Sequence, residues 1–233
     1  MPATASTRWP RVGVRIGTGR NAELIGQLRA RELDAVIGRL SDPELMAGLS
    51  FEPLYAEPMV IVLRPGHALA PSTAAAKKAA VERAPRRTAA AAAPAKSARS
   101  AKAVRPAAPE LARLGAHALV LPPAGTLIRQ VADNFLRRHG VVPLAGTVET
   151  LDTALARALV LQTDNLWFTP RGAVQADLDS GALLRLGVDL TPEEAVGLML
   201  RTEPSTSATL QTFIAAVRSG AAQQRNGRGR RGR

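Results

Sequence analysis

The most informative stretch of this sequence is NAELIGQLRARELDAVIGRL, residues 21–40. Leu24, Ile25 and Leu28 recur at helical spacing, so the pattern predicts an amphipathic helix that buries one face. The run DAVIGRL (34–40) follows at once and predicts a strand, because its apolar residues are consecutive and partly β-branched. A helix that leads directly into a strand is typical of α/β proteins.

The neighbouring segments extend this pattern in both directions. RVGVRIG (11–17) is a short β-branched run before a TGRN turn and predicts a strand. FEPLYAEP (51–58) predicts a loop, and MVIVLRP (59–65) a fully apolar strand. Apolar strands between helices favour a parallel sheet that is covered on both faces.

The alternation resumes after residue 113. The predicted strands there are HALVLPP (117–123), VVPLAGTVET (141–150), NLWFTP (165–170), ALLRLGVD (182–189) and AVGLMLR (195–201). The predicted helices are TLIRQVADNFLRRHG (126–140), ended by Gly140 as a C-cap, LDTALARALVLQTD (151–164), RGAVQADLDSG (171–181) and STSATLQTFIAAVRS (205–219). The sequence therefore predicts an α/β protein in two lobes.

Composition excludes several classes of function. The 233 residues are 46% hydrophobic, enough for a packed core, and contain no Cys. Thiolate metal sites, iron–sulfur ligation and cysteine nucleophiles are thereby excluded. His67, His117 and His139 lack metal-ligand spacing, and GTGRN lacks the further glycine or lysine of a nucleotide loop. We expect no metal, no cofactor and no enzymatic activity.

Targeting signals are also missing from the sequence. No apolar run approaches the ~18 residues that a membrane span requires. The start, MPATASTRWPRVGV, has no apolar core of a secretory signal. We therefore expect a cytoplasmic protein.

The net charge of +12 is concentrated in two segments. Residues 71–113 hold ten Lys or Arg and two Glu, with 18 Ala and five Pro, and residues 218–233 hold six Arg and no acidic residue. Such compositions have little apolar bulk to offset ordering entropy, so residues 71–113 and 220–233 are predicted to be disordered and open to trypsin. They would contact DNA only non-specifically, through charge.

Small polar residues follow several predicted strands. Thr18 lies in IGTGRN, Gly125 and Thr126 lie in LPPAGT, and Thr169 ends WFT. Helix N-termini favour anions, and Arg39 after DAVIG adds a cation at another strand end. Ligands of open α/β sheets bind beyond the carboxyl ends of strands. These residues predict a carboxylate site.

Three stretches resemble the effector-binding region of LysR-type transcriptional regulators. They are NAELIGQLRARELDAVIGRLSDPELMAGLSFEPLYAEPMVIVLRPGHALA, HALVLPPAGTLIRQVADNFLRRHG and DNLWFTPRGAVQADLDSGALLRL. The resemblance is strongest in the segments ELDAVIGRL, VLRPGHALA and VLPPAGTLIR, and it covers residues 11–70 and 114–219. The branch it is most similar to contains regulators of protocatechuate catabolism (the pca operon) and of a galactose-binding protein.

The resemblance implies an α/β, two-lobed periplasmic-binding-protein-like (type 2) fold with the effector between the lobes. The implied domains are a leader (1–10), lobe I (11–70 and 195–219), a low-complexity insertion (71–113), lobe II (114–194) and a disordered tail (220–233). The implied effector is a small organic acid, and homo-oligomerisation is expected. The implied contacts are Thr18, Arg39, Gly125, Thr126, Thr169 and Pro170.

The sequence also departs from the family. It has no counterpart of the family's helix-turn-helix, nor, in residues 1–10, of the first strand and helix of lobe I. These departures predict a truncated regulator with an incomplete first lobe. Two alternatives remain open: a solute-binding protein that serves a transporter, and a nucleic-acid-binding protein that acts through its basic segments.

Overall fold

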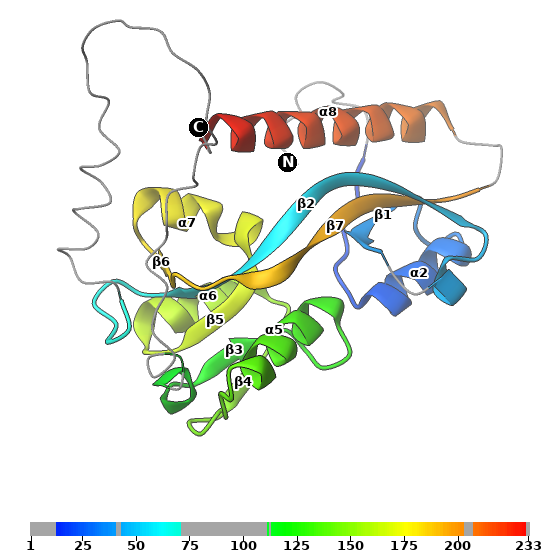
Figure 1. Ribbon diagram of the computed structural model, residues 1–233. Helices are drawn as coiled ribbons and strands as arrows, with labels where there is room; N and C mark the ends of the chain where they lie inside the picture. The colour runs from blue at the N-terminus through cyan, green and yellow to red at the C-terminus, as the bar shows by residue number, and fades with distance from the viewer. Residues whose placement is uncertain (1–12, 41–42, 71–110, 112, 203–206, 232–233) are drawn as a thin grey trace, which may run out of the picture. The chain divides into compact units, whose positions relative to one another are not determined.

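The computed structural model describes residues 13–40, 43–70, 111, 113–202 and 207–231 (Figure 1). The predicted leader (1–10) lies outside the described residues. So does the predicted insertion (71–113), apart from Leu111 and Arg113. Leu111 is buried in the core of the protein.

Strands and helices alternate along the described chain, as the α/β prediction requires. The strands are β1 (Val36–Arg39), β2 (Leu49–Leu63), β3 (Leu119–Leu121), β4 (Thr147–Glu149), β5 (Leu166–Pro170), β6 (Leu184–Arg185) and β7 (Leu190–Arg201). The α-helices are α2 (Asn21–Arg29), α5 (Leu127–Arg138), α6 (Thr153–Gln162), α7 (Gln175–Ser180) and α8 (Ala208–Arg231). The 3-10 helices are η1 (Pro43–Met46), η2 (Arg113–Ala116) and η3 (Arg171–Val174). Hydrogen bonds join the strands in the order β1-β7-β2-β5-β3-β4, and β6 pairs with β2.

The chain divides into two compact units. Unit 1 contains the described residues up to Pro58, the segment Gly125–Leu127 and the chain from Pro192 onward, and unit 2 contains the rest. The division falls inside β2 and β7, so each of these strands contributes to both units. The sequence places the lobe boundaries after residues 70 and 194 instead.

In unit 1, helix α2 packs against β1 and the end of β7. Ile25 and Leu28 are buried with Val36 and Met199, which confirms the apolar stripe predicted for this helix. Strand β1 is antiparallel to β7, with Gly38 opposite Gly197. The side-chain positions of the stripe thus fix which face of α2 meets the sheet.

Unit 2 has a sheet that is covered on both faces. Alternate residues of β2, β3 and β5 belong to two separate apolar clusters, because successive strand side chains point to opposite faces. Val131 and Phe135 of α5 pack on one face, and Ala156 and Val160 of α6 pack on the other. Strand β3 is parallel to both β4 and β5, as the apolar strands predict, whereas β2 is antiparallel to β5.

The predicted strand at 11–17 is not formed where the structure describes it. Residues 13–20 have no regular secondary structure, and the side chain of Ile16 is 71% exposed. β-branched residues favour a strand only when a partner strand provides hydrogen bonds and packing. No strand in the described part of the chain pairs with these residues.

Residues 51–58, predicted as a loop, belong to β2 instead. Pro53 and Pro58 suggested a loop because proline has no N–H to donate. Burial of Leu54 against Leu198 and Ile214 outweighs this local preference and extends the strand from Leu49. Proline is tolerated where the strand needs no donor at that position.

Two other predicted strands are shorter than expected. Only Thr147–Glu149 of 141–150 forms a strand, because the amides of Leu144 and Ala145 donate to the carbonyl of Gly115 instead of a neighbouring strand. Within 182–189, only Leu184–Arg185 forms a strand.

The tail also differs from its prediction. Residues 220–233 are predicted to be disordered, but α8 continues to Arg231 and runs alongside β2 (Figure 1). Ala221 is buried with Leu54, and the guanidinium of Arg225 donates to the Leu54 carbonyl. Composition indicated disorder, whereas contacts with β2 hold this part of the helix.

Candidate functional site

The start of α2 and the end of β1 meet in unit 1. The side-chain amide of Asn21, the first residue of α2, donates to the carbonyl of Arg39, the last residue of β1, at 2.9 Å. Thr18 precedes α2 and is exposed. The structure therefore places the predicted GTGRN loop beside the predicted Arg39 strand end.

Arg39 itself is not an exposed cation. Its side chain is only 8% exposed, and Nη2 donates to the carbonyl of Glu57 at 3.4 Å. The sequence predicted a cation at the end of this strand. The structure places Arg39 there as a buried residue of unit 1, where it also links β1 to β2.

Gly125 and Thr126 lie in the loop between β3 and α5. Gly125 has φ +82°, a left-handed conformation that favours glycine, and a Cβ added there would meet nothing within 4 Å. Thr126 is half-buried and directly precedes Leu127, the first residue of α5. Both residues share unit 1 with Thr18 and Arg39.

Thr169 and Pro170 end β5 in unit 2. Thr169 is 2% exposed, and its hydroxyl lies 3.5 Å from the carbonyl of Pro170. The two residues pair with Val60 and Met59 of β2. Of the six predicted contacts, four thus share unit 1 and two share unit 2.

Sequence reasoning missed two groups of polar residues in unit 2. The first surrounds Arg129 of α5, which bonds to Asp133, Glu149 and the Pro122 carbonyl. The i,i+4 spacing of Arg129 and Asp133 is visible in the sequence and predicts their ion pair. The contact with Glu149 joins distant segments, and no local pattern indicates it.

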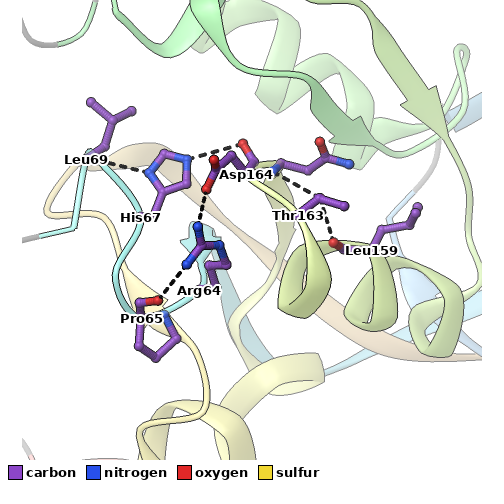
Figure 2. A network of polar contacts seen from close by, with 8 residues as sticks. Arg64, Pro65, His67, Leu69, Leu159, Thr163 and Asp164 are labelled. Atoms are coloured by element: carbon purple, nitrogen blue, oxygen red, sulfur yellow. Dashed lines mark hydrogen bonds and ion pairs between the residues drawn. The ribbon is translucent and has the colours of Figure 1, made fainter.

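The second group is centred on His67, which is 3% exposed (Figure 2). Its Nδ1 accepts the amide N–H of Leu69 at 3.0 Å, so the ring proton sits on Nε2 and faces the carbonyl of Asp164 at 3.2 Å. The carboxylate of Asp164 also pairs with Arg64 at 2.8 Å. Burial lowers the pKa of His67, and the His117 ring 4.4 Å away reinforces this. His67 is therefore a neutral, structural imidazole.

Within the described ranges no group of three or more His, Asp, Glu or Cys side chains is arranged to hold a metal ion. None of the described helices is both long and apolar enough to cross a membrane.

Solved structures show the fold of this protein. The regulatory domain of CcmR from Synechocystis PCC6803, solved in complex with 2-PG, superposes with a TM-score of 0.62 at 15% identity, covering 94% of this chain and 88% of that one. The protein thus has the α/β, periplasmic-binding-protein-like (type 2) fold of regulatory domains, as predicted.

The family follows from the sequence comparison. The LysR substrate binding domain matches residues 3–86 and 86–222, and the chain belongs to this family, which confirms the resemblance. It is 31% identical over 216 residues to the HTH-type transcriptional regulator PcaQ of Agrobacterium fabrum, covering 92% of this chain. It is 30% identical over 206 residues to the uncharacterised HTH-type transcriptional regulator YdcI of Escherichia coli, covering 88% of this chain. The chain spans 58% and 56% of the length of these two relatives.

Proposed function

We propose that this effector-binding domain senses a small organic acid and that Arg39 supplies the cation that recognises it. Membership of the LysR substrate binding domain family supports a ligand-binding role. The CcmR regulatory domain, which shares the fold, is solved in complex with 2-PG. The residues at the strand ends support the effector class.

The observation that carries the proposal is the burial of Arg39 at the end of β1. Removing a guanidinium from water is costly, so a buried arginine is retained where its charge or its donors are used. Its five N–H donors form a fork that matches the geometry of a carboxylate.

The loop before α5 favours the same ligand chemistry. Thr126 offers a hydroxyl next to the first turn of α5, where backbone N–H groups and the helix dipole attract anions. Together with the similarity to PcaQ, this chemistry supports a dicarboxylic acid of aromatic catabolism, similar to muconate.

Calorimetric titration with a panel of muconate-like acids tests the proposal. We expect at least one acid to bind the wild-type chain, and Arg39→Gln to weaken it by ~1.5–3 kcal/mol, the usual contribution of a charge-assisted hydrogen bond. Arg157→Gln is the matched control, because Arg157 is an exposed arginine that pairs with Asp177. Thermal unfolding of each variant separates lost binding from lost folding. Equal affinity of wild type and Arg39→Gln would refute the assignment of Arg39.

The wider context is proposed from the family alone. We infer that the domain acts in the cytoplasm, as part of a transcriptional regulator that self-associates. The basic segments 71–113 and 218–233 are expected to bind DNA through charge only. Binding of the chain to unrelated DNA sequences should then fall steeply as salt rises.

A further inference from the structure

Arg129 is the centre of a polar cluster at one edge of the unit 2 sheet. Its Nη1 lies 2.5 Å from Glu149 Oε1, and its Nε lies 2.8 Å from Asp133 Oδ1. The Arg129 side chain is 16% exposed, whereas both carboxylates are more than 40% exposed. Burial alone lowers the pKa of Arg129, but its bonds to Glu149 and Asp133 outweigh this and raise the pKa. The guanidinium therefore stays charged.

The same cluster forms hydrogen bonds with the backbone of the loop that joins β3 to α5. Arg129 Nη1 donates to the carbonyl of Pro122 at 3.1 Å, and Glu149 Oε2 accepts the amide N–H of Ala124 at 3.4 Å. Each partner of the ion pair thus holds a different backbone group of the loop. One ion pair fixes both Pro122 and Ala124.

The sheet register explains why these residues meet. Leu121, the last residue of β3, is directly opposite Glu149, the last residue of β4. The amide of Thr150 donates to the Leu121 carbonyl at 3.0 Å and continues this pairing by one bond. Because Arg129 lies in the first turn of α5, the cluster ties two strand ends to the beginning of a helix.

Two residues in the middle of this loop are open to solvent. Ala124 and Gly125 are exposed, and Gly125 has open space around it. Glycine also has the widest backbone freedom of any residue. The conformation of the segment that leads to Thr126 therefore depends on the bonds to Pro122 and Ala124.

We propose that the Arg129–Glu149 ion pair is a positioning device that holds the loop from Pro122 to Thr126 in its binding conformation. The pair acts through the loop and does not contact the effector, because Arg129 is already paired with two carboxylates, which leave the cluster net negative and unsuited to bind an acid. The inference rests on the proposed function, in which Thr126 contacts the acid. It adds two positioning residues, Arg129 and Glu149, to that site.

Hydrogen exchange and calorimetry on the 233-residue chain test this proposal together. Glu149→Ala removes the ion pair and the acceptor for the Ala124 amide, while the exposed position of Glu149 keeps the fold intact. We expect the Ala124 amide to exchange about tenfold faster by NMR, and the affinity for a muconate-like acid to fall about tenfold. Glu149→Gln, which keeps an acceptor oxygen but loses the charge, should give a smaller effect on both.

Two comparisons make the test specific. Asp177→Asn breaks the ion pair with Arg157, which bonds to no residue of the loop, and should change neither measurement. Arg129→Ala combined with Glu149→Ala should have a larger effect than Glu149→Ala alone, because it also removes the bond to the Pro122 carbonyl, but a smaller effect than the sum of the two single substitutions, because the two residues are coupled.

The outcomes separate this inference from the proposed function. Unchanged Ala124 exchange in Glu149→Ala would overturn the holding role, and faster exchange with unchanged affinity would overturn the positioning role. A wild-type chain that binds no acid would contradict the proposed function instead. In that case the exchange comparison would still decide whether the pair holds the loop.

Discussion

The side-chain amide of Asn21 lies 2.9 Å from the backbone carbonyl of Arg39 and joins the start of α2 to the end of β1. This bond anchors the strand end that carries Arg39. Asn21→Ala should lower the free energy of unfolding by ~0.5–1.5 kcal/mol, the net contribution of one hydrogen bond. Urea denaturation measures the change, and Asn134→Ala, an exposed position on α5, is the control. Equal effects of the two substitutions would show that the bond contributes nothing.

Gly197 of β7 marks a place where unit 1 has no room for a side chain. A Cβ there would lie 2.4 Å from the ring of Phe51 and 2.6 Å from the carbonyl of Glu52. Gly197→Ala should therefore destabilise the protein by ~1–3 kcal/mol, as overpacking does. Gly26→Ala is the opposite case, because Gly26 lies within α2 with open space around it. It should stabilise the protein by ~0.5–1 kcal/mol. If thermal unfolding shifts in the same direction for both, this account of the two glycines is wrong.

The continuation of α8 past residue 219 has a direct test in Ala221, which is 1% exposed. Ala221→Asp would bury a carboxylate against Leu54 and Ile214, and should destabilise the protein by several kcal/mol (~2–4). Ala215→Asp places the same residue on the exposed face of α8 and should cost less than ~1 kcal/mol. A disordered tail would make the two variants equally stable in urea denaturation.

His67 predicts a dependence of stability on pH. Its folded-state pKa is lowered by burial, so as the pH falls the unfolded chain binds the proton first, at its ordinary value of about 6.5. The free energy of unfolding should thus be highest above about pH 6.5 and fall as the pH drops toward the folded-state pKa. For this one group, the free energy of unfolding should fall by at most ~1.4 kcal/mol per pH unit.

Urea denaturation between pH 5 and 8 measures this slope. His67→Gln should remove the contribution of the group, and His139→Gln should leave it in place. The groups that face His67 are His117, Asp164 and Arg64, so the variant must keep all three. A slope that survives His67→Gln would assign the pH dependence to other residues.

Local patterns predicted most elements of this fold. Residues close together in the chain form the apolar stripes of α2 and α5 and the apolar runs of β1, β3 and β5, so these elements could be predicted. The errors arose where distant contacts decide the structure. Residues 51–58 form a strand because Leu54 packs against β7 and α8, and 13–20 stay irregular because no described strand pairs with them. No local pattern carries this information.

The candidate site, too, could be predicted only where local patterns decide the structure. The positions of Thr18, Arg39 and Thr169 at the ends of elements could be predicted from turn residues and strand lengths. The burial of Arg39 could not be predicted, because its partner Glu57 lies 18 residues further along the chain, in a segment that the sequence predicts to be a loop. The hydrogen bond from the Ala124 amide to Glu149 could not be predicted either, since it depends on the register of β3 with β4.

A crystal structure of the chain with a bound muconate-like acid tests the central claim most directly. The account predicts that one carboxylate of the acid lies within about 3.2 Å of the Arg39 guanidinium, the range of a charge-assisted hydrogen bond. It also predicts that the acid contacts Thr126 and leaves Arg129 bonded to Glu149. An acid bound elsewhere, with Arg39 out of contact, would contradict the account.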